Sequence, residues 1–218
     1  MISSSIDWTG WEARFEQFLL SDTLTHDAAH DLEHIRRVVA TAKALARAEQ
    51  ADLAVVIPAA WLHDCVIVPK DSPLRSQASG LAAQAALGFL RTSGYPESHL
   101  DAIHHAIEAH SFSANIPPRG CAAQVVQDAD RLDALGAIGV ARCLMLGGAI
   151  GRRLYDPHEP FPIARALDDA INTVDHFYLK LLRLADTMTT PAGRAEAQRR
   201  TVFMCQFLEQ LRSEIMPI

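Results

Sequence analysis

The chemically richest short stretch of this sequence stands at the end of an apolar run. Leu53 to Leu62 is an apolar segment of helical length, and it ends in His63 and Asp64. Such a helix carries an imidazole and a carboxylate, two common metal ligands, from buried surroundings to an opening. A lone His–Asp pair also occurs where a helix simply ends in polar residues. His34 upstream and Asp130 downstream are further ligand-type residues, and their presence favours a metal site.

Three further helices must position these residues. A second helix begins at Asp27 or Asp31 and carries His34 on or beside an apolar stripe. A fifth follows Pro96 and runs to His110, and a sixth covers Cys121 to Leu135 and carries Asp128, Asp130 and Asp133.

Histidines recur every fourth residue before and within the second helix. His26, His30 and His34 would share one face if the helix started early, and could then form a metal face of their own. In the alternative, His26 and His30 precede or cap the helix and only His34 points inward.

The rest of the chain also has helical periodicity, without an alternating run of strand length and without a repeat. We therefore expect an all-α bundle in a single domain over residues 1–218, with a metal-site core over about 24–146 and C-terminal helices over about 161–216. The remaining expected elements are helices at Trp8–Leu20, Ser76–Leu90, Gly136–Leu146, Ile163–Met188 and Pro191–Ile215, and a long loop at Gly147–Pro157.

Composition narrows the class of protein. A hydrophobic content of 49% in 218 residues suffices for a sizeable core, and a net charge of −6 argues against a nucleic-acid polymer as partner. The four cysteines, Cys65, Cys121, Cys143 and Cys205, show no CxxC spacing and lie in apolar runs, as free core thiols do. No leader-like start or membrane-length apolar run is present, so we expect a cytoplasmic protein without membrane contact. The long C-terminal helices would permit a homodimer.

The order His, then His-Asp, then Asp resembles the HD superfamily of metal-dependent phosphohydrolases. Two longer segments, residues 127–142 (QDADRLDALGAIGVAR) and 176–181 (HFYLKL), look like the small bacterial single-domain branch of that superfamily. The resemblance covers roughly Leu24 to Leu211 and implies an HD-domain helical bundle. It also implies a small phosphorylated substrate, with a nucleotide favoured because the nearest branch is associated with nucleoside triphosphate pyrophosphohydrolysis.

By this resemblance, His34, His63, Asp64 and Asp130 match the four metal-ligand positions of the superfamily. A set of two nitrogen and two oxygen ligands suits Mn²⁺, Mg²⁺, Fe²⁺, Co²⁺ or Ni²⁺ in an open arrangement. Asp128 is the rival for the last position, pointing about 200° around a helix from Asp130. The Ala-Asp-x-Leu pattern favours Asp130.

The catalytic acid is less evident. Many relatives carry an acidic residue shortly after the His-Asp doublet, whereas this chain continues Cys65-Val-Ile-Val68. Beside Asp64 itself, Glu108 or Asp128 could position or activate water, or the metal alone could suffice.

Basic and histidine side chains supply candidate substrate contacts. We expect Arg37, Lys70 and Lys180 to contact phosphate, with Arg75 as a further candidate in the loop that follows the doublet, against the alternative of solvated surface charges. His104 and His110 could contact substrate, hold a second metal ion or be structural. On an unbroken helix they lie about 120° and ~9 Å apart, too far for one ion.

Two other readings remain open. A bundle that keeps the site but only senses a metal or nucleotide would bind without turnover, and the missing acid after the doublet favours it. A helical scaffold whose histidines and aspartates merely cap helices would retain no metal after dialysis.

Overall fold

The computed structural model describes residues 6–22, 32–68, 72, 74–112 and 114–216. Within these residues the regular structure is helical, and the one strand-like pairing is an isolated bridge between Arg153 and Asn172. The all-α prediction is confirmed.

The chain divides into two compact units, Met1–Asp130 and Arg131–Ile218, which are described separately. The prediction of one domain over the whole chain stays a prediction. Unit 1 contains α1 (Trp8–Asp22), α2 (Leu32–Glu49), α3 (Leu53–Leu62), α4 (Ala78–Thr92), α5 (Leu100–His110) and most of α6 (Cys121–Leu132). Unit 2 contains the end of α6, then α7 (Gly136–Ala149), α8 (Thr173–Leu179) and α9 (Pro191–Ile215). Short 3₁₀ turns lie at Arg75–Gln77 and Glu97–His99 in unit 1 and at Leu181–Thr187 in unit 2.

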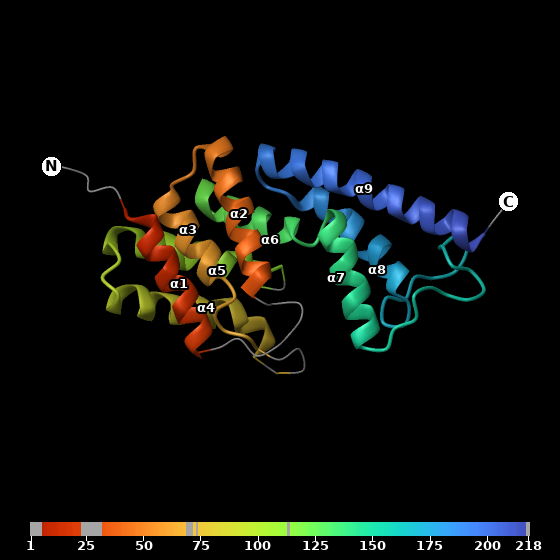
Figure 1. Ribbon diagram of the computed structural model, residues 1–218, viewed down its shortest axis with the longest axis horizontal. Coiled ribbons are helices and arrows are strands. Elements are labelled where there is room, and N and C mark those ends of the chain that lie inside the picture. The colour runs from red at the N-terminus through yellow and green to blue at the C-terminus, as the bar shows by residue number, and fades with distance from the viewer. Residues whose placement is uncertain (1–5, 23–31, 69–71, 73, 113, 217–218) are drawn as a thin grey trace. The chain divides into compact units, whose positions relative to one another are not determined.

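Helix α3 is the centre of unit 1. It packs against α1, α2 and α5 (Figure 1). Every residue from Ala54 to Leu62 is buried. Asp52 caps its first turn by accepting a hydrogen bond from the backbone N–H of Ala54 at 2.9 Å. The sequence predicted this helix and its end at the His-Asp doublet, and both are confirmed.

Pro58 lies inside α3 and removes one backbone hydrogen bond, as expected. Proline has no N–H, so the carbonyl of Ala54, four residues earlier, loses its usual helical donor. The hydroxyl of Tyr95 donates to this carbonyl at 2.7 Å and replaces the missing bond. Tyr95, which lies in the connection between α4 and α5, therefore completes the hydrogen bonding of α3.

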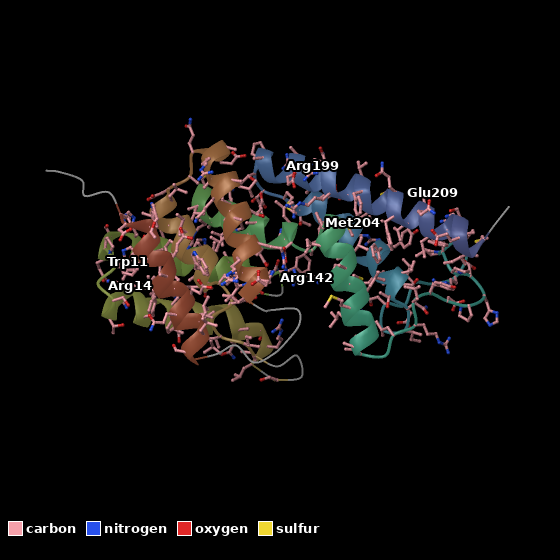
Figure 2. All side chains as sticks on the ribbon, viewed as in Figure 1. Trp11, Arg14, Arg142, Arg199, Met204 and Glu209 are labelled. Carbon is pink, nitrogen blue, oxygen red and sulfur yellow. The ribbon has the colours of Figure 1, made fainter. Side chains whose placement is uncertain are left out.

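Polar contacts fasten α1 to this core. The carboxylate of Glu12 accepts a hydrogen bond from Lys43 on α2 at 2.6 Å and from the indole of Trp61 on α3 at 3.2 Å. Trp11 and Arg14 also project from α1 (Figure 2), where the guanidinium of Arg14 lies 5.0 Å from the centre of the Trp11 ring. One turn of α1 thus contacts α2, which carries His34, and α3, which ends at His63.

In unit 2 the predicted helix Ile163–Met188 is wrong in its first ten residues. Helix α8 starts only at Thr173, and the chain breaks into a 3₁₀ turn at Leu181. Upstream, the Glu159 carboxylate accepts hydrogen bonds from the backbone N–H groups of three consecutive residues, 163 to 165. The Glu159 carboxylate therefore ties residues 163 to 165 back to the preceding turn, and the chain forms no helix before Thr173.

The same loop is fixed to α8 by a buried ion pair. Asp175 is fully buried, and its two oxygens accept hydrogen bonds from Arg165 at 2.5 and 2.6 Å. The backbone N–H of Asp168 donates to the same carboxylate at 2.8 Å. The sequence analysis placed Arg165 within a helix. In the structure it lies in the loop and anchors that loop to α8.

Two smaller expectations also need correction. The sixth helix ends at Leu132 and not at Leu135, because the chain turns at Gly136, whose φ of 71° is left-handed. Cys65 and Cys143 are buried, but Cys121 and Cys205 are exposed, so only half of the cysteines are core thiols.

Among the described residues, no single helix is both long and apolar enough to cross a membrane. Helices α6 and α7 pass that test only when they are taken together across the break between them.

Candidate metal centre

Four helices of unit 1 bring their polar residues to one place. His34 lies in the first turn of α2, His63 caps the end of α3 with Asp64 next to it, His110 ends α5, and Asp130 lies in the last turns of α6. We call these five side chains the His–Asp cluster. Three of its members end or follow a buried helix, which explains how polar groups reach an otherwise apolar interior.

The distances within the cluster are short. Nε2 of His34 lies 3.5 Å from Asp130 Oδ1 and 3.9 Å from Asp64 Oδ2. Nε2 of His63 lies 3.7 Å from each of the same two oxygens. Two ligands that are each about 2.1 Å from a shared ion must be about 3–4.2 Å apart, and these pairs meet that requirement.

Backbone contacts orient two of the imidazoles. Nδ1 of His63 lies 2.8 Å from the Ala60 carbonyl, and Nδ1 of His110 lies 2.5 Å from the Ile107 carbonyl. A carbonyl only accepts, so each Nδ1 carries a proton and each Nε2 faces the cluster, where the neutral ring of His63 presents its lone pair. This is the second contact that metal-binding histidines commonly make.

Nε2 of His63 gives the clearest sign that the cluster takes a cation. This atom is buried and has no hydrogen-bond partner among the described residues. A buried polar atom without a partner is costly, and a buried lone pair aimed at carboxylates fits a metal ion.

The electrostatics favour the protonation states that a ligand requires. Burial, the largest effect, lowers the pKa of His63 and keeps its ring neutral. Burial alone would raise the pKa of Asp130, but the hydrogen bond with His34 and the other imidazoles beside it lower it to about 2. Neutral imidazole and ionised carboxylate are the forms that bind metals.

The cluster also has an opening. The three histidines are buried, whereas the side chains of Asp64 and Asp130 are 24% and 26% exposed. Two overlapping sets of side chains could each hold an ion: His34 with His63 and Asp130, and His63 with Asp64 and His110. The four predicted ligands are thus brought together, and His110 joins them from α5.

His110 contacts the far oxygen of a shared carboxylate. Its Nε2 lies 3.5 Å from Asp64 Oδ1, whereas His34 and His63 face Oδ2. Burial lowers the pKa of His110, but the hydrogen bond with Asp64 and the charges of Asp64 and Asp130 together raise it. Asp64 therefore lies between two groups of imidazoles.

A buried glutamine that the sequence analysis missed links two of the contributing helices. The side-chain amide of Gln127 on α6 donates to the carbonyl of Ala109 on α5 at 2.7 Å. Ala109 precedes His110, and Gln127 precedes Asp130 by one turn. Its polar neighbours along α6, Gln124 and Asp128, gave no signal that set this amide apart.

The other predicted acidic residues lie elsewhere. Asp128 is fully buried on α6, and among the described residues it belongs to neither set that could hold an ion. Glu108 is two residues from His110 and therefore points about 200° around α5 from it. Nδ1 of His104 lies 4.0 Å from Glu108, so these two share a face of α5 away from the cluster.

Glu108 lines a cavity of about 270 Å³ between α4 and α5. The other lining residues belong to the start of α4 and to the loop after α5: Ser76, Gln77, Ser79, Gly80, Leu81, Gln84, Ala114 and Ile116. We call this space the α4–α5 cavity.

The predicted phosphate contacts have different positions. Arg37 is half-buried on α2, three residues after His34 and so about 60° from it around the helix. Arg75 donates to the carbonyl of Val68 at 2.9 Å and braces the loop after the doublet. Lys70 lies outside the described residues. Lys180 follows α8 in unit 2 and is exposed.

Comparisons with known proteins identify the family of this chain. The family model of the HD domain matches residues 31–135. The Bacillus subtilis protein YpgQ is 36% identical over 203 residues, which cover 91% of this chain and 89% of YpgQ.

Solved structures give the same result. The crystal structure of YpgQ in complex with ADP has a TM-score of 0.71 at 33% identity, covering 94% of this chain and 98% of that one. An HD-superfamily hydrolase from Bacillus thuringiensis has a TM-score of 0.72 at 33% identity, covering 94% and 96%. A Lactobacillus plantarum protein has a TM-score of 0.71 at 34% identity, covering 96% and 98%.

Proposed function

Because this chain belongs to the HD superfamily, we propose that it is a metal-dependent phosphohydrolase whose substrate is a nucleotide. The observation that carries the proposal is the His–Asp cluster, in which the buried His63 Nε2 has no hydrogen-bond partner among the described residues. The ADP complex of YpgQ supports a nucleotide as the class of ligand.

His34, His63, Asp64 and Asp130 are the proposed metal ligands. Their donor set of nitrogen and oxygen suits Mn²⁺, Mg²⁺, Fe²⁺, Co²⁺ or Ni²⁺. When bound, a divalent cation in such a site lowers the pKa of water and neutralises charge on phosphoryl oxygens.

Asp64 and His110 are the side chains best placed to handle the reacting groups. Asp64 is partly exposed beside buried imidazoles, so its carboxylate can accept a proton from an attacking water. Nε2 of His110 faces the same carboxylate and can donate a hydrogen bond to a phosphoryl oxygen. Two residues in contact would thus act on the water and on the phosphate.

Further side chains are proposed around this pair. Arg37 shares a sector of α2 with His34 and is the proposed phosphate contact within unit 1. Lys70 and Lys180 remain phosphate-contact proposals that rest on the sequence alone. Asp128 and Glu108 remain proposals for an acid that positions water, since the segment after the doublet, Cys65 to Val68, contains no acidic residue. Cys65 is buried and donates to the Ala82 carbonyl at 3.3 Å.

The test is the release of phosphate and pyrophosphate from nucleoside mono-, di- and triphosphates with Mn²⁺. The native protein is compared with Asp64→Asn and Asp130→Asn, and Asp101→Asn is the matched control because Asp101 is an exposed carboxylate at the other end of α5. We expect the two cluster variants to lose at least about a hundredfold in kcat, since even outer residues of metal sites cost up to that much.

The outcomes separate the candidate functions. Turnover by the native protein and by Asp101→Asn, but not by the two cluster variants, supports the hydrolase. Saturable binding of Mn²⁺ and nucleotide without turnover would contradict the hydrolase and favour a sensing module. Full activity in Asp130→Asn would remove the cluster from the mechanism.

A further inference from the structure

A histidine of α5 fastens the segment that joins α5 to α6. The backbone N–H of Arg119 donates a hydrogen bond to Nε2 of His105 at 2.9 Å. Pro117 and Pro118 precede Arg119 and have no N–H, so among residues 117–119 only Arg119 has a backbone donor. We call this contact the His105 latch.

The latch requires a neutral imidazole. A ring nitrogen accepts a hydrogen bond through its lone pair, and protonation turns the same nitrogen into a donor. The guanidinium of Arg119 also lies beside the ring, with Nη2 3.4 Å from Nδ1 of His105. A positive charge on the imidazole would therefore face both a backbone N–H and a second positive charge.

The groups around the ring favour its neutral form. Burial and the charge of Arg119 lower the pKa of His105, and His104 lowers it further. Glu108, one turn later on α5, and a hydrogen bond with the Pro117 backbone raise the pKa, but the lowering effects prevail. Protonation thus works against the latch, and Glu108 is the alternative partner of a protonated ring.

The latch is separate from the His–Asp cluster. Among the described residues, neither His105 nor its neighbour His104 belongs to a set of side chains that could hold an ion. The latched segment contributes Ala114 and Ile116 to the lining of the α4–α5 cavity. The latch therefore holds one wall of that cavity in place.

From these contacts we propose that the His105 latch is a pH-sensitive device that holds residues 114–120 against α5 in neutral solution and releases them in acid. Above about pH 6.5, the ordinary pKa of histidine, the stabilising effect of the latch is fully present. Because the latched ring has the lower pKa, that effect is lost as pH falls from about 6.5 towards the pKa of the latched ring. The cavity wall formed by Ala114 and Ile116 moves with the released segment.

The experiment measures solvent exchange of the Arg119 amide by NMR at pH 7.5, 6.5 and 5.5, corrected for the intrinsic exchange rate at each pH. We expect the protection of this amide to fall at least about threefold from pH 7.5 to pH 5.5, because a latch that requires the neutral ring weakens on protonation. The amides within α5 and α6 should keep their protection over the same range.

Two variants separate His105 from other titrating groups. In His105→Gln the side-chain carbonyl can accept from Arg119 at every pH, so the protection should no longer depend on pH. In His105→Phe the acceptor is lost, so the protection should be low throughout. His104→Gln is the matched control, because His104 is the adjacent histidine of α5 and faces Glu108 at 4.0 Å. It should keep the native pH dependence.

Three results would overturn the proposal. The first is protection of the Arg119 amide that stays constant between pH 7.5 and pH 5.5 in the native protein. The second is an equal fall in His105→Gln, which would assign the pH dependence to another group. The third is a parallel loss of protection along α5 and α6, which would indicate unfolding of the helices in place of release of the segment.

Discussion

At the scale of single residues, the account depends on how side chains at helix ends are held. The ring of His63 is oriented by the carbonyl of Ala60, within its own last turn, and His110 uses Ile107 in the same way. This contact between a histidine and the carbonyl three residues earlier is local. The orientation of such a ring is therefore set within one helical turn. His63 was nevertheless predicted as a ligand from the family resemblance, and His110 was left open between substrate contact, second metal and structural role.

Gln127 is the opposite case, since its contact with Ala109 joins two helices. Replacing it by leucine would leave a buried carbonyl without its donor, and we expect a loss of about 1–3 kcal/mol in the free energy of unfolding. Mn²⁺ affinity should also fall, because Asp130 and His110 would no longer be held together. Urea unfolding and Mn²⁺ titration measure the two effects.

The control for Gln127 is Gln124→Leu, one turn earlier on α6 and only half-buried. It should change neither quantity by much. If Gln127→Leu is as stable as Gln124→Leu and binds Mn²⁺ equally well, the hydrogen bond between Gln127 and Ala109 has no role in stability or metal binding.

At the scale of elements, α3 shows why a helix that ends in ligands tolerates a proline. Tyr95 serves the Ala54 carbonyl that Pro58 leaves without a donor. Tyr95→Phe should therefore cost about 1–2 kcal/mol. In a Pro58→Ala background the new backbone N–H can serve the same carbonyl, so Tyr95→Phe should cost clearly less. Urea unfolding of the four proteins completes this double-mutant cycle.

The cycle has a clear contrary outcome. If Tyr95→Phe costs the same with proline and with alanine at position 58, the hydroxyl does not replace the missing helical bond.

The helices that carry the site were predictable because each combines an apolar stripe with a local end signal, such as Asp52 before α3 or the turn at Gly136 after α6. The loop before α8 was not predicted, because its hydrogen bonds are made with Glu159 and Asp175, which lie outside residues 163–172. The α4–α5 cavity was also beyond the sequence, since Gly80 and Glu108 face one another only after two helices pack together.

At the scale of the whole molecule, buried and paired carboxylates in unit 2 make stability depend on acidity. Burial raises the pKa of Asp175, but its hydrogen bonds with Arg165 and the Asp168 backbone outweigh burial and lower it. Hydrogen bonds from Arg199 and Arg200 lower the pKa of Glu196 to about 2. Groups with a depressed folded pKa stabilise the protein above their unfolded pKa, near 4, and lose that effect as pH falls towards the folded value.

We therefore expect the native chain to lose stability between about pH 4.5 and pH 2. Asp175→Asn should be less stable at pH 7 by about 2 kcal/mol, because charge-assisted hydrogen bonds to a buried group are lost. Its stability should also fall less steeply with acid. Urea midpoints at pH 7, 5 and 3.5 test both, and parallel curves for the two proteins would contradict the assignment.

The central claim is that the His–Asp cluster of unit 1 binds a divalent cation. The most direct measurement is an electron paramagnetic resonance titration of Mn²⁺ into protein freed of metal by chelation and dialysis. We predict saturable binding by the native chain and by Asp101→Asn, and at least a tenfold weaker affinity in Asp130→Asn. Absence of saturable binding by the native chain, or equal affinity in Asp130→Asn, would contradict the account.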